Sequence, residues 1–192
     1  GHKTIIGDAS FVPSLSQFRL EAIPAWDVRN LLVNRGTLLV INEAILARGG
    51  LTDDDKRTVI KHAMKAIIGY GDALLYFHGA YDWSYVEKRR RMAALADAPA
   101  AVRALYDEAM GFRFRPDYPA YLHRDLAEWN QHLCESLASV HLACERRRLR
   151  LPALTWTTYG DAAFAHALTE DWQRPRAVAK KLVAAVSSAD AR

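Results

Sequence analysis

Residues 66–95, AIIGYGDALLYFHGAYDWSYVEKRRRMAAL, decide how the fold is interpreted. Their apolar residues recur at three- and four-residue spacing, which predicts a helix, a tight turn at Gly79 and a second helix. Gly69 and Gly71 lie inside the first of these helices, where each costs on the order of 1 kcal/mol relative to alanine. Close approach of a neighbouring backbone or side chain is the usual compensation. We therefore expect another helix to pack tightly against this one.

Asp72 lies between apolar positions of the same helix and needs a partner if the fold buries it. Arg35, Tyr85 and Arg89 are the candidate partners. The simplest interpretation is a structural salt bridge inside a helical bundle, because buried charges are normally paired.

A second interpretation assigns these polar groups to a binding site. In this interpretation a pocket lies at the junction between the first helix and the second. It would be lined by Asp72, Tyr81, Ser84 and Tyr85. The basic run 88–91 would present positive charge beside it, which suits an acidic or phosphorylated ligand.

Length and composition are those of one globular domain. The chain has 192 residues, of which 51% are hydrophobic and 25% charged, without a low-complexity tract. No apolar run approaches the roughly 20 residues that cross a bilayer, so we expect no membrane association. Cys134 and Cys144 fall on one predicted helix, about 15 Å apart, and cannot pair with each other. We expect a reduced, cytoplasmic protein.

The remaining pattern predicts an all-α fold, an antiparallel helical bundle. Thr52 and Asp82 are the expected N-caps of two helices. The helices are expected at residues 24–48, 52–78, 83–96, 99–113, 120–150, 159–168 and 175–187.

Only the N-terminal segment alternates in the manner of a β-strand, between Thr4 and Leu20. Two strands without a covering element are marginally stable. We therefore divide the chain into an extended arm at 1–20, a bundle at 21–150 and C-terminal helices at 151–192 that pack on the bundle.

Motifs for metal binding or hydrolysis are weak. Asp53–Asp55 could hold a divalent cation, but carboxylates at the start of a helix favour the positive end of its dipole, and this explanation is preferred. Arg57 and His62 match the loose arginine and histidine pattern of some helical RNases, although nothing in a regular helix gathers them at a groove.

The segments IPAWDVRNLLVNRGTLL (23–39), GDALLYFHGAYDWSYVEKRRRMAAL (71–95) and LYDEAMGFRFRPDY (105–118) carry a resemblance. They resemble the helical domain that follows the catalytic domain in bacterial and archaeal nucleotidyltransferases of the polymerase-beta-like superfamily. The resemblance covers residues 20–120. It implies a HEPN-like four-helix bundle that binds substrate or regulates the catalytic domain. The site residues that it favours are Arg35, Asp72, Tyr81, Ser84, Tyr85 and Arg89.

The catalytic half of that superfamily uses a Gly-Ser turn followed by an Asp-x-Asp pair, and this sequence has no such arrangement. We therefore expect the chain alone to be inactive and to contain no catalytic residue, metal or cofactor. The resemblance implies that a nucleoside triphosphate and Mg²⁺ belong to a catalytic half that is fused or encoded separately. Residues 1–20 would then be a remnant of the nucleotidyltransferase sheet, and a nucleotide or an RNA is an expected acceptor.

Two other functions stay open at this stage. A free-standing HEPN-type RNase or toxin component would use Arg57 and His62. A structural dimerisation bundle would use exposed apolar surface, such as Trp156 and Trp172, to contact a second copy.

Overall fold

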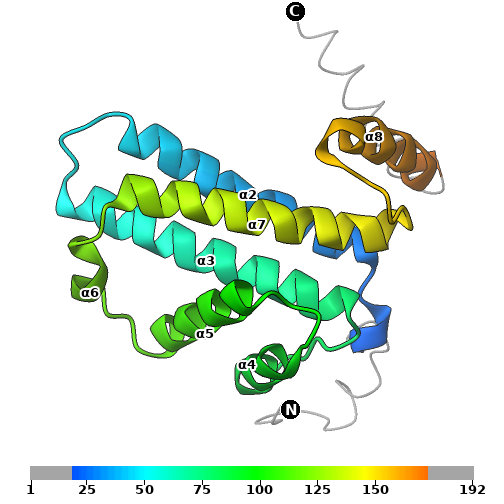
Figure 1. Ribbon diagram of the computed structural model, residues 1–192, viewed down its shortest axis with the longest axis horizontal. Coiled ribbons are helices and arrows are strands. Elements are labelled where there is room, and N and C mark those ends of the chain that lie inside the picture. Colours follow the sequence, from blue (N-terminus) through cyan, green and yellow to red (C-terminus); the bar gives the residue numbers. More distant parts are fainter. Residues whose placement is uncertain (1–18, 173–192) are drawn as a thin grey trace, which may run out of the picture. The chain divides into compact units, whose positions relative to one another are not determined.

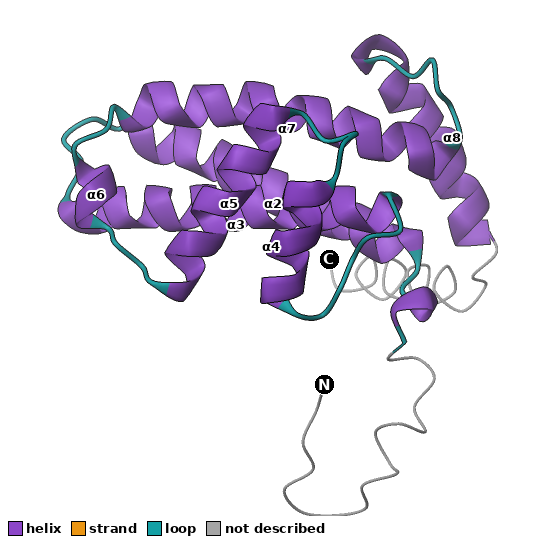
Figure 2. Cartoon of the chain, turned by 60° about the horizontal axis from the view of Figure 1, so that its bottom comes forward, coloured by secondary structure: helices purple, strands orange, loops and turns teal. Residues whose placement is uncertain are grey.

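The computed structural model describes residues 19–172, and this part of the chain is all-α, as predicted (Figures 1 and 2). Its elements are a 3₁₀ helix, η2 (Leu20–Ala22), and the α-helices α2 (Ala25–Leu46), α3 (Asp53–Phe77), α4 (Tyr85–Ala94), α5 (Ala100–Phe114), α6 (Pro119–Leu122), α7 (Leu126–Leu149) and α8 (Trp156–Trp172). Leu20, expected to end an extended arm, begins η2 instead. The rest of that arm and the helix expected at 175–187 lie outside the described residues.

The chain divides into two compact units within α7, between Cys144 and Glu145. The first unit contains η2, the helices from α2 to α6 and most of α7. The second contains the last turns of α7 and all of α8. None of the helices described here combines the length and the apolar content that a bilayer crossing requires.

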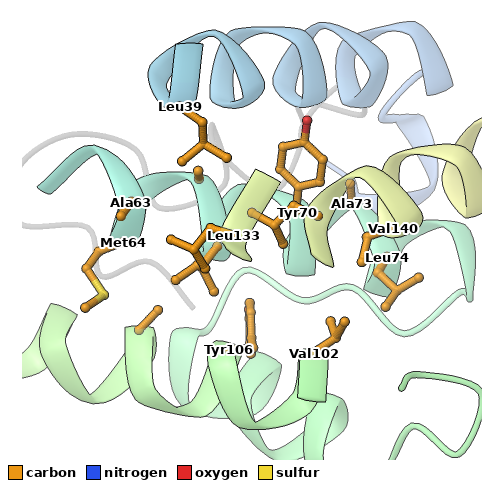
Figure 3. Close-up of a cluster of buried hydrophobic side chains, with 14 of the residues drawn as sticks. Leu39, Ala63, Met64, Tyr70, Ala73, Leu74, Val102, Tyr106, Leu133 and Val140 are labelled. Atoms are coloured by element: carbon orange, nitrogen blue, oxygen red, sulfur yellow. The ribbon is translucent and has the colours of Figure 1, made fainter. Parts of the chain in front are cut away.

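Helix α3 is the central element of the first unit (Figure 1). Helix α2 packs along one side of it and α5 along another, and α4 packs against both α3 and α5. Figure 3 shows the core between them: Tyr70 points from α3 toward α2, while Val102 and Tyr106 approach from α5. Leu133 and Val140 of α7 complete the same core cluster. Apolar side chains on most sides of α3 therefore all find partners, which explains why that helix is buried along much of its length.

The two glycines of α3 lie where neighbours come closest, as predicted. A Cβ atom at Gly71 would overlap the ring of Tyr106 on α5, and one at Gly69 would overlap the side chain of Arg35 on α2. Helices α2 and α5 therefore approach α3 more closely than alanine at these positions would allow.

One of the expected helix boundaries is confirmed in detail and two are wrong. Thr52 forms a reciprocal capping box with Asp55, so Asp53–Asp55 serve as a helix start. Asp82 is not the cap of α4: Ser84 is, and the Asp82 side chain accepts from the Ser84 amide. The single helix expected at 120–150 is two helices, α6 and α7. The Asp125 side chain accepts hydrogen bonds from the amides of Ala127 and Glu128, so a new helix begins after it.

The second unit has its own polar contacts. Glu145 and Arg148 form a buried ion pair with Oε2 and Nη2 2.8 Å apart. Arg146 Nε donates to the Leu154 carbonyl at 2.8 Å, which fixes the loop after α7. Helix α8 begins three residues earlier than expected and continues to Trp172. Cys134 and Cys144 are not disulfide-bonded, in agreement with the sequence.

Candidate functional site

A cavity of about 360 Å³ opens where the chain enters the bundle. The start of α2, the end of α3 and the loop between α3 and α4 meet there. Tyr76 on α3 donates its hydroxyl to the Ile23 carbonyl at 2.7 Å and so holds the entering segment against the bundle. The cavity is lined by Ala22, Ile23, Pro24, Asp27, Val28, Leu31, Asp72, Tyr76, Tyr81 and Trp83.

Asp72 forms the polar floor of this cavity and is held from two sides. Lys88 Nζ of α4 lies 2.6 Å from Asp72 Oδ2, and the Tyr106 hydroxyl of α5 donates to Oδ1 at 2.6 Å. The Lys88 side chain is 3% exposed and that of Asp72 is 12% exposed. The structural salt bridge expected at Asp72 is therefore present, and it joins three helices.

The expected partners of Asp72 were wrong. Arg35 lies against Gly69, and Arg89 pairs with Asp107, with Nη2 2.9 Å from Oδ2. Tyr85 contacts the cation of the pair instead of the carboxylate: Lys88 Nζ lies 4.2 Å from the centre of its ring. The actual partner, Lys88, belongs to the same basic run as Arg89 and directly precedes it. Its side chain points into the bundle.

Aromatic rings surround the buried ammonium group of Lys88. The Tyr81 ring lies 5.1 Å from Nζ, in addition to the Tyr85 ring, and Arg113 Cζ lies 4.0 Å from the centre of the Tyr85 ring. Tyr85 is thus in contact with two cations. Such contacts contribute about 0.5–2 kcal/mol each, depending on how far the cation is desolvated. The rings offset part of the cost of removing Lys88 from water.

Two tyrosine hydroxyl groups at the site remain protonated at neutral pH. Burial, reinforced by the negative charge of Asp72, raises the pKa of Tyr81 to about 12. Burial and then Asp72 raise the pKa of Tyr106 as well. Both groups are therefore hydrogen-bond donors under ordinary conditions. Trp83 packs edge-on against Tyr81, with ring centres 5.8 Å apart, and its side chain remains 53% exposed at the mouth of the cavity.

The basic run 88–91 does not form an unpaired positive wall. Beyond Lys88 and Arg89, Arg91 lies 2.8 Å from Asp82 and 2.9 Å from Glu87, and Arg90 also binds Glu87. Hydrogen bonds from Arg90 and Arg91 lower the pKa of Glu87 to about 2. Every cation of the run is thus matched by a carboxylate, so the expectation of a positive surface for an acidic ligand is not met at this place.

The structure brings together some of the predicted site residues and separates others. Asp72 and Tyr81 line the cavity. Ser84 caps α4, where its hydroxyl accepts from the Glu87 amide at 3.4 Å. Tyr85 is not among the lining residues, and its ring contacts Lys88. Arg35 and Arg89 are not among the lining residues.

Of the ten lining residues, only Asp72 and Tyr81 are among the predicted site residues, and sequence reasoning missed both partners of Asp72, Lys88 and Tyr106. Asp27 has the pattern of an ordinary first-turn carboxylate of a helix, and Tyr76 that of a core aromatic residue, whereas Trp83 belongs to the turn whose Tyr, Trp and Ser groups were expected either to lock two helices together or to form one wall of a pocket. Tyr106 lies 34 positions after Asp72 and carries no local motif. The one available signal was the cluster of aromatic residues around the turn at Gly79, which did predict a pocket in this region.

Arg57 and His62, the alternative catalytic pair, have separate structural partners. Arg57 Cζ lies 5.3 Å from the centre of the Tyr118 ring. His62 Nδ1 donates to Asn42 Oδ1 at 3.0 Å, inside a buried network that continues from Asn42 to Asn130 on α7. Burial, with Lys65 and Lys61 nearby, lowers the pKa of His62. Five residues apart on one helix, Arg57 and His62 point about 140° away from each other.

No protein-family model matches this chain, and neither does any curated protein or solved structure.

Proposed function

We propose that this chain is the accessory, substrate-binding helical domain of a nucleotidyltransferase, and that the cavity at the start of α2 holds the acceptor. One observation carries the proposal: the cavity includes Ala22, Ile23 and Pro24, the point at which the preceding segment enters the bundle. An acceptor bound there would lie beside whatever domain is attached to that segment. A separately encoded catalytic half could dock at the same end.

The lining supports a neutral or cationic acceptor that carries hydroxyl groups. Lys88 neutralises Asp72 and is too buried to reach a ligand, whereas Asp27 is exposed at the rim. The exposed indole of Trp83 and the ring of Tyr81 offer flat apolar surfaces for stacking. The Tyr81 hydroxyl, protonated at neutral pH, can donate a hydrogen bond to an acceptor oxygen.

Chemistry on the acceptor belongs to the catalytic half. Nucleotidyl transfer relies on positioning and on metal ions that neutralise the phosphate charge. The Gly-Ser turn and Asp-x-Asp pair that would bind a nucleoside triphosphate and Mg²⁺ are absent from this sequence. The contribution proposed for this chain is to bind and orient the acceptor hydroxyl, which is a large part of the catalytic effect in such reactions.

A charge series of sugars tests the pocket in the chain itself. Glucosamine, glucose and glucose 6-phosphate share one skeleton and differ in charge, so binding measured by NMR should weaken in that order. Trp83→Ala should weaken all three, because it removes the stacking surface. Asp27→Asn should weaken glucosamine selectively. Val86→Ala is the matched control, since Val86 is 69% exposed on α4 and does not line the cavity.

Each result has a defined meaning. If glucose 6-phosphate binds best, the acceptor is anionic, and a nucleotide or an RNA end replaces the neutral or cationic acceptor. If no member of the series perturbs Trp83, the cavity does not bind an acceptor of this class and the proposal fails in this form. The coding sequence upstream of Lys3 is the companion observation: a Gly-Ser turn with an Asp-x-Asp pair there, or in an adjacent gene, supports the nucleotidyltransferase assignment.

A further inference from the structure

Three cations follow one another on the exposed surface of α3. Arg57, Lys61 and Lys65 are all exposed and are spaced four residues apart, so each begins about 6 Å further along the helix than the one before it. Residues at this spacing form one ridge on a helix surface. Within the described part of the chain, none of the three forms an ion pair with a carboxylate.

Arg35 of α2 continues this ridge at the next position. Four residues after Lys65 comes Gly69, which has no side chain, and the Cγ and Cδ atoms of Arg35 lie where a side chain of residue 69 would begin. Among the residues that the structure describes, Arg35 has no carboxylate partner either. We call Arg57, Lys61, Lys65 and Arg35 the basic ridge. From Arg57 to Gly69 it is about 18 Å long.

The basic ridge is unfavourable for the chain by itself. Like charges four residues apart on a helix repel each other, and the ridge contains two such pairs, Arg57 with Lys61 and Lys61 with Lys65. Burial lowers the pKa of His62, and the charges of Lys65 and Lys61 lower it further, which shows the positive potential at this place. Cations nearby on the same surface are matched by carboxylates: Arg48 by Asp55, Lys56 by Asp53 and Arg89 by Asp107. An anionic ligand would relieve the repulsion within the ridge.

We infer that the basic ridge binds the phosphate backbone of a single-stranded nucleic acid. A stacked strand carries one phosphate per about 3.4 Å, so the roughly 18 Å of the ridge run along about five phosphates. Each of the four cations can therefore meet a phosphate of the same strand, whereas a free nucleotide would reach only part of the ridge. None of the four residues lines the cavity at the start of α2, so this site is separate from the proposed acceptor pocket.

The arrangement favours a single strand over a duplex. The ridge is one line of charges and faces one backbone, whereas a duplex presents two. Arg57 adds a contact that needs unpaired bases: its Cζ atom lies 5.3 Å from the centre of the Tyr118 ring, and guanidinium groups and aromatic rings stack on the faces of unstacked bases. Contacts to phosphates carry no sequence information, so we expect binding without a strong sequence preference.

The salt dependence of binding counts the phosphates that the ridge neutralises. Fluorescence anisotropy of a labelled uridine oligonucleotide of about twelve nucleotides gives the association constant K of the full chain. For four contacts to a single strand, log K should fall against the logarithm of the salt concentration with a slope of about −2.8. Lys61→Gln and Lys65→Gln should each reduce the slope to about −2.1 and weaken binding about 15-fold at about 20 mM salt.

Arg90→Gln is the matched control. Arg90 has a side chain 69% exposed and binds Glu87, so this variant removes the same net charge from a cation that already has a partner. Its slope and its affinity for the oligonucleotide should stay close to those of the parent. Lys61 and Lys65 are exposed, so all three variants should keep the far-ultraviolet circular dichroism of the parent.

Each result either supports or overturns the inference. Binding that weakens in both lysine variants and not in Arg90→Gln supports it. An oligonucleotide that fails to bind at about 20 mM salt, or that binds the lysine variants as tightly as the parent, overturns it. Tighter binding of the same strand annealed to its complement would contradict the choice of a single strand. Tripolyphosphate or polyglutamate that competes as well as the unlabelled oligonucleotide would assign the ridge to a small polyphosphate or to an acidic protein instead.

Discussion

A lysine side chain with 3% exposure is stable in a helical bundle only if its charge has a close partner, because an isolated buried ammonium group costs several kcal/mol. Lys88 meets this requirement through Asp72, at 2.6 Å, and through the Tyr85 ring. Asp72 in turn accepts from Tyr106. The three charged and polar groups therefore form one unit in which each member makes the burial of another tolerable.

The first prediction concerns this unit. Lys88→Met should lower the free energy of unfolding by about 3 kcal/mol, because Asp72 is left partly buried without its cation. The double variant Asp72→Asn, Lys88→Met should lose less than the single variant, since no charge then remains unpaired. Urea unfolding of the parent, both single variants and the double variant completes the cycle. If the loss of unfolding free energy in the double variant equals the sum of the losses in the two single variants, Asp72 and Lys88 are not coupled.

Sequence reasoning reached part of this arrangement. It identified Asp72 as a residue that needs a partner, because a carboxylate between apolar helix positions has few alternatives. It did not identify Lys88, since a lysine inside a run of four basic residues looks like part of a solvated face. The choice among Lys88, Arg89 and Arg90 depends on the rotation of α4 against α3, which no local pattern specifies.

At the scale of the helices, the glycine positions of α3 carried the most information. Their cost in helix propensity pointed to close packing, and the contacts of Gly71 with α5 and of Gly69 with α2 confirm it. Helix ends were less predictable. The break between α6 and α7 depends on whether Asp125 caps a new helix or continues an old one, and both are compatible with its neighbours in sequence.

The second prediction compares alanine at three helix glycines. Gly71→Ala should destabilise by about 1–3 kcal/mol, because its methyl group meets the buried Tyr106 ring. Gly69→Ala should also destabilise, because its methyl group meets the Cγ and Cβ atoms of Arg35, the part of that side chain next to the α2 backbone. Gly111→Ala on α5 has open space and should stabilise by up to about 1 kcal/mol through helix propensity.

Chemical denaturation of the three variants gives the order directly. Gly111→Ala is the control for propensity, and the difference between it and Gly71→Ala isolates the packing cost. If Gly71→Ala proved as stable as Gly111→Ala, α5 could move away from α3 without penalty, and the close contact with Tyr106 would not contribute to specifying the fold.

For the whole molecule, the sequence predicts the fold class better than it predicts the site. Fold class follows from apolar spacing that repeats over many residues, so a local error such as the wrong cap of α4 does not change it. The cavity is different: Asp27, Asp72 and Trp83 come from three separate elements, and their meeting depends on tertiary packing. A pocket was expected near the turn, and Asp72 and Tyr81 do line the cavity, while the other eight of its ten lining residues required the structure.

The third prediction is an alkaline loss of stability that belongs to the bundle as a whole. Folding raises the pKa of Tyr81 and of Tyr121 to about 12, and it also raises that of Tyr106, in each case chiefly through burial. In the unfolded chain these hydroxyl groups have a pKa of about 10. Between these values the folded protein retains protons that the unfolded protein has released. Stability from these groups is therefore complete below about pH 10 and is lost as the pH rises toward the folded values.

Tyr106→Phe separates this effect from general alkaline damage. At neutral pH the variant should be less stable than the parent by about 1 kcal/mol, because Asp72 loses a hydrogen bond. Above about pH 10 the difference in stability between the parent and the variant should narrow. The parent loses stability there because its unfolded chain releases the Tyr106 proton, and the variant has no hydroxyl at this position to ionise. Urea unfolding from about pH 8 to about pH 11 measures both curves. Parallel curves would show that Tyr106 does not contribute to the alkaline transition, and would place the origin of that transition in Tyr81 or Tyr121.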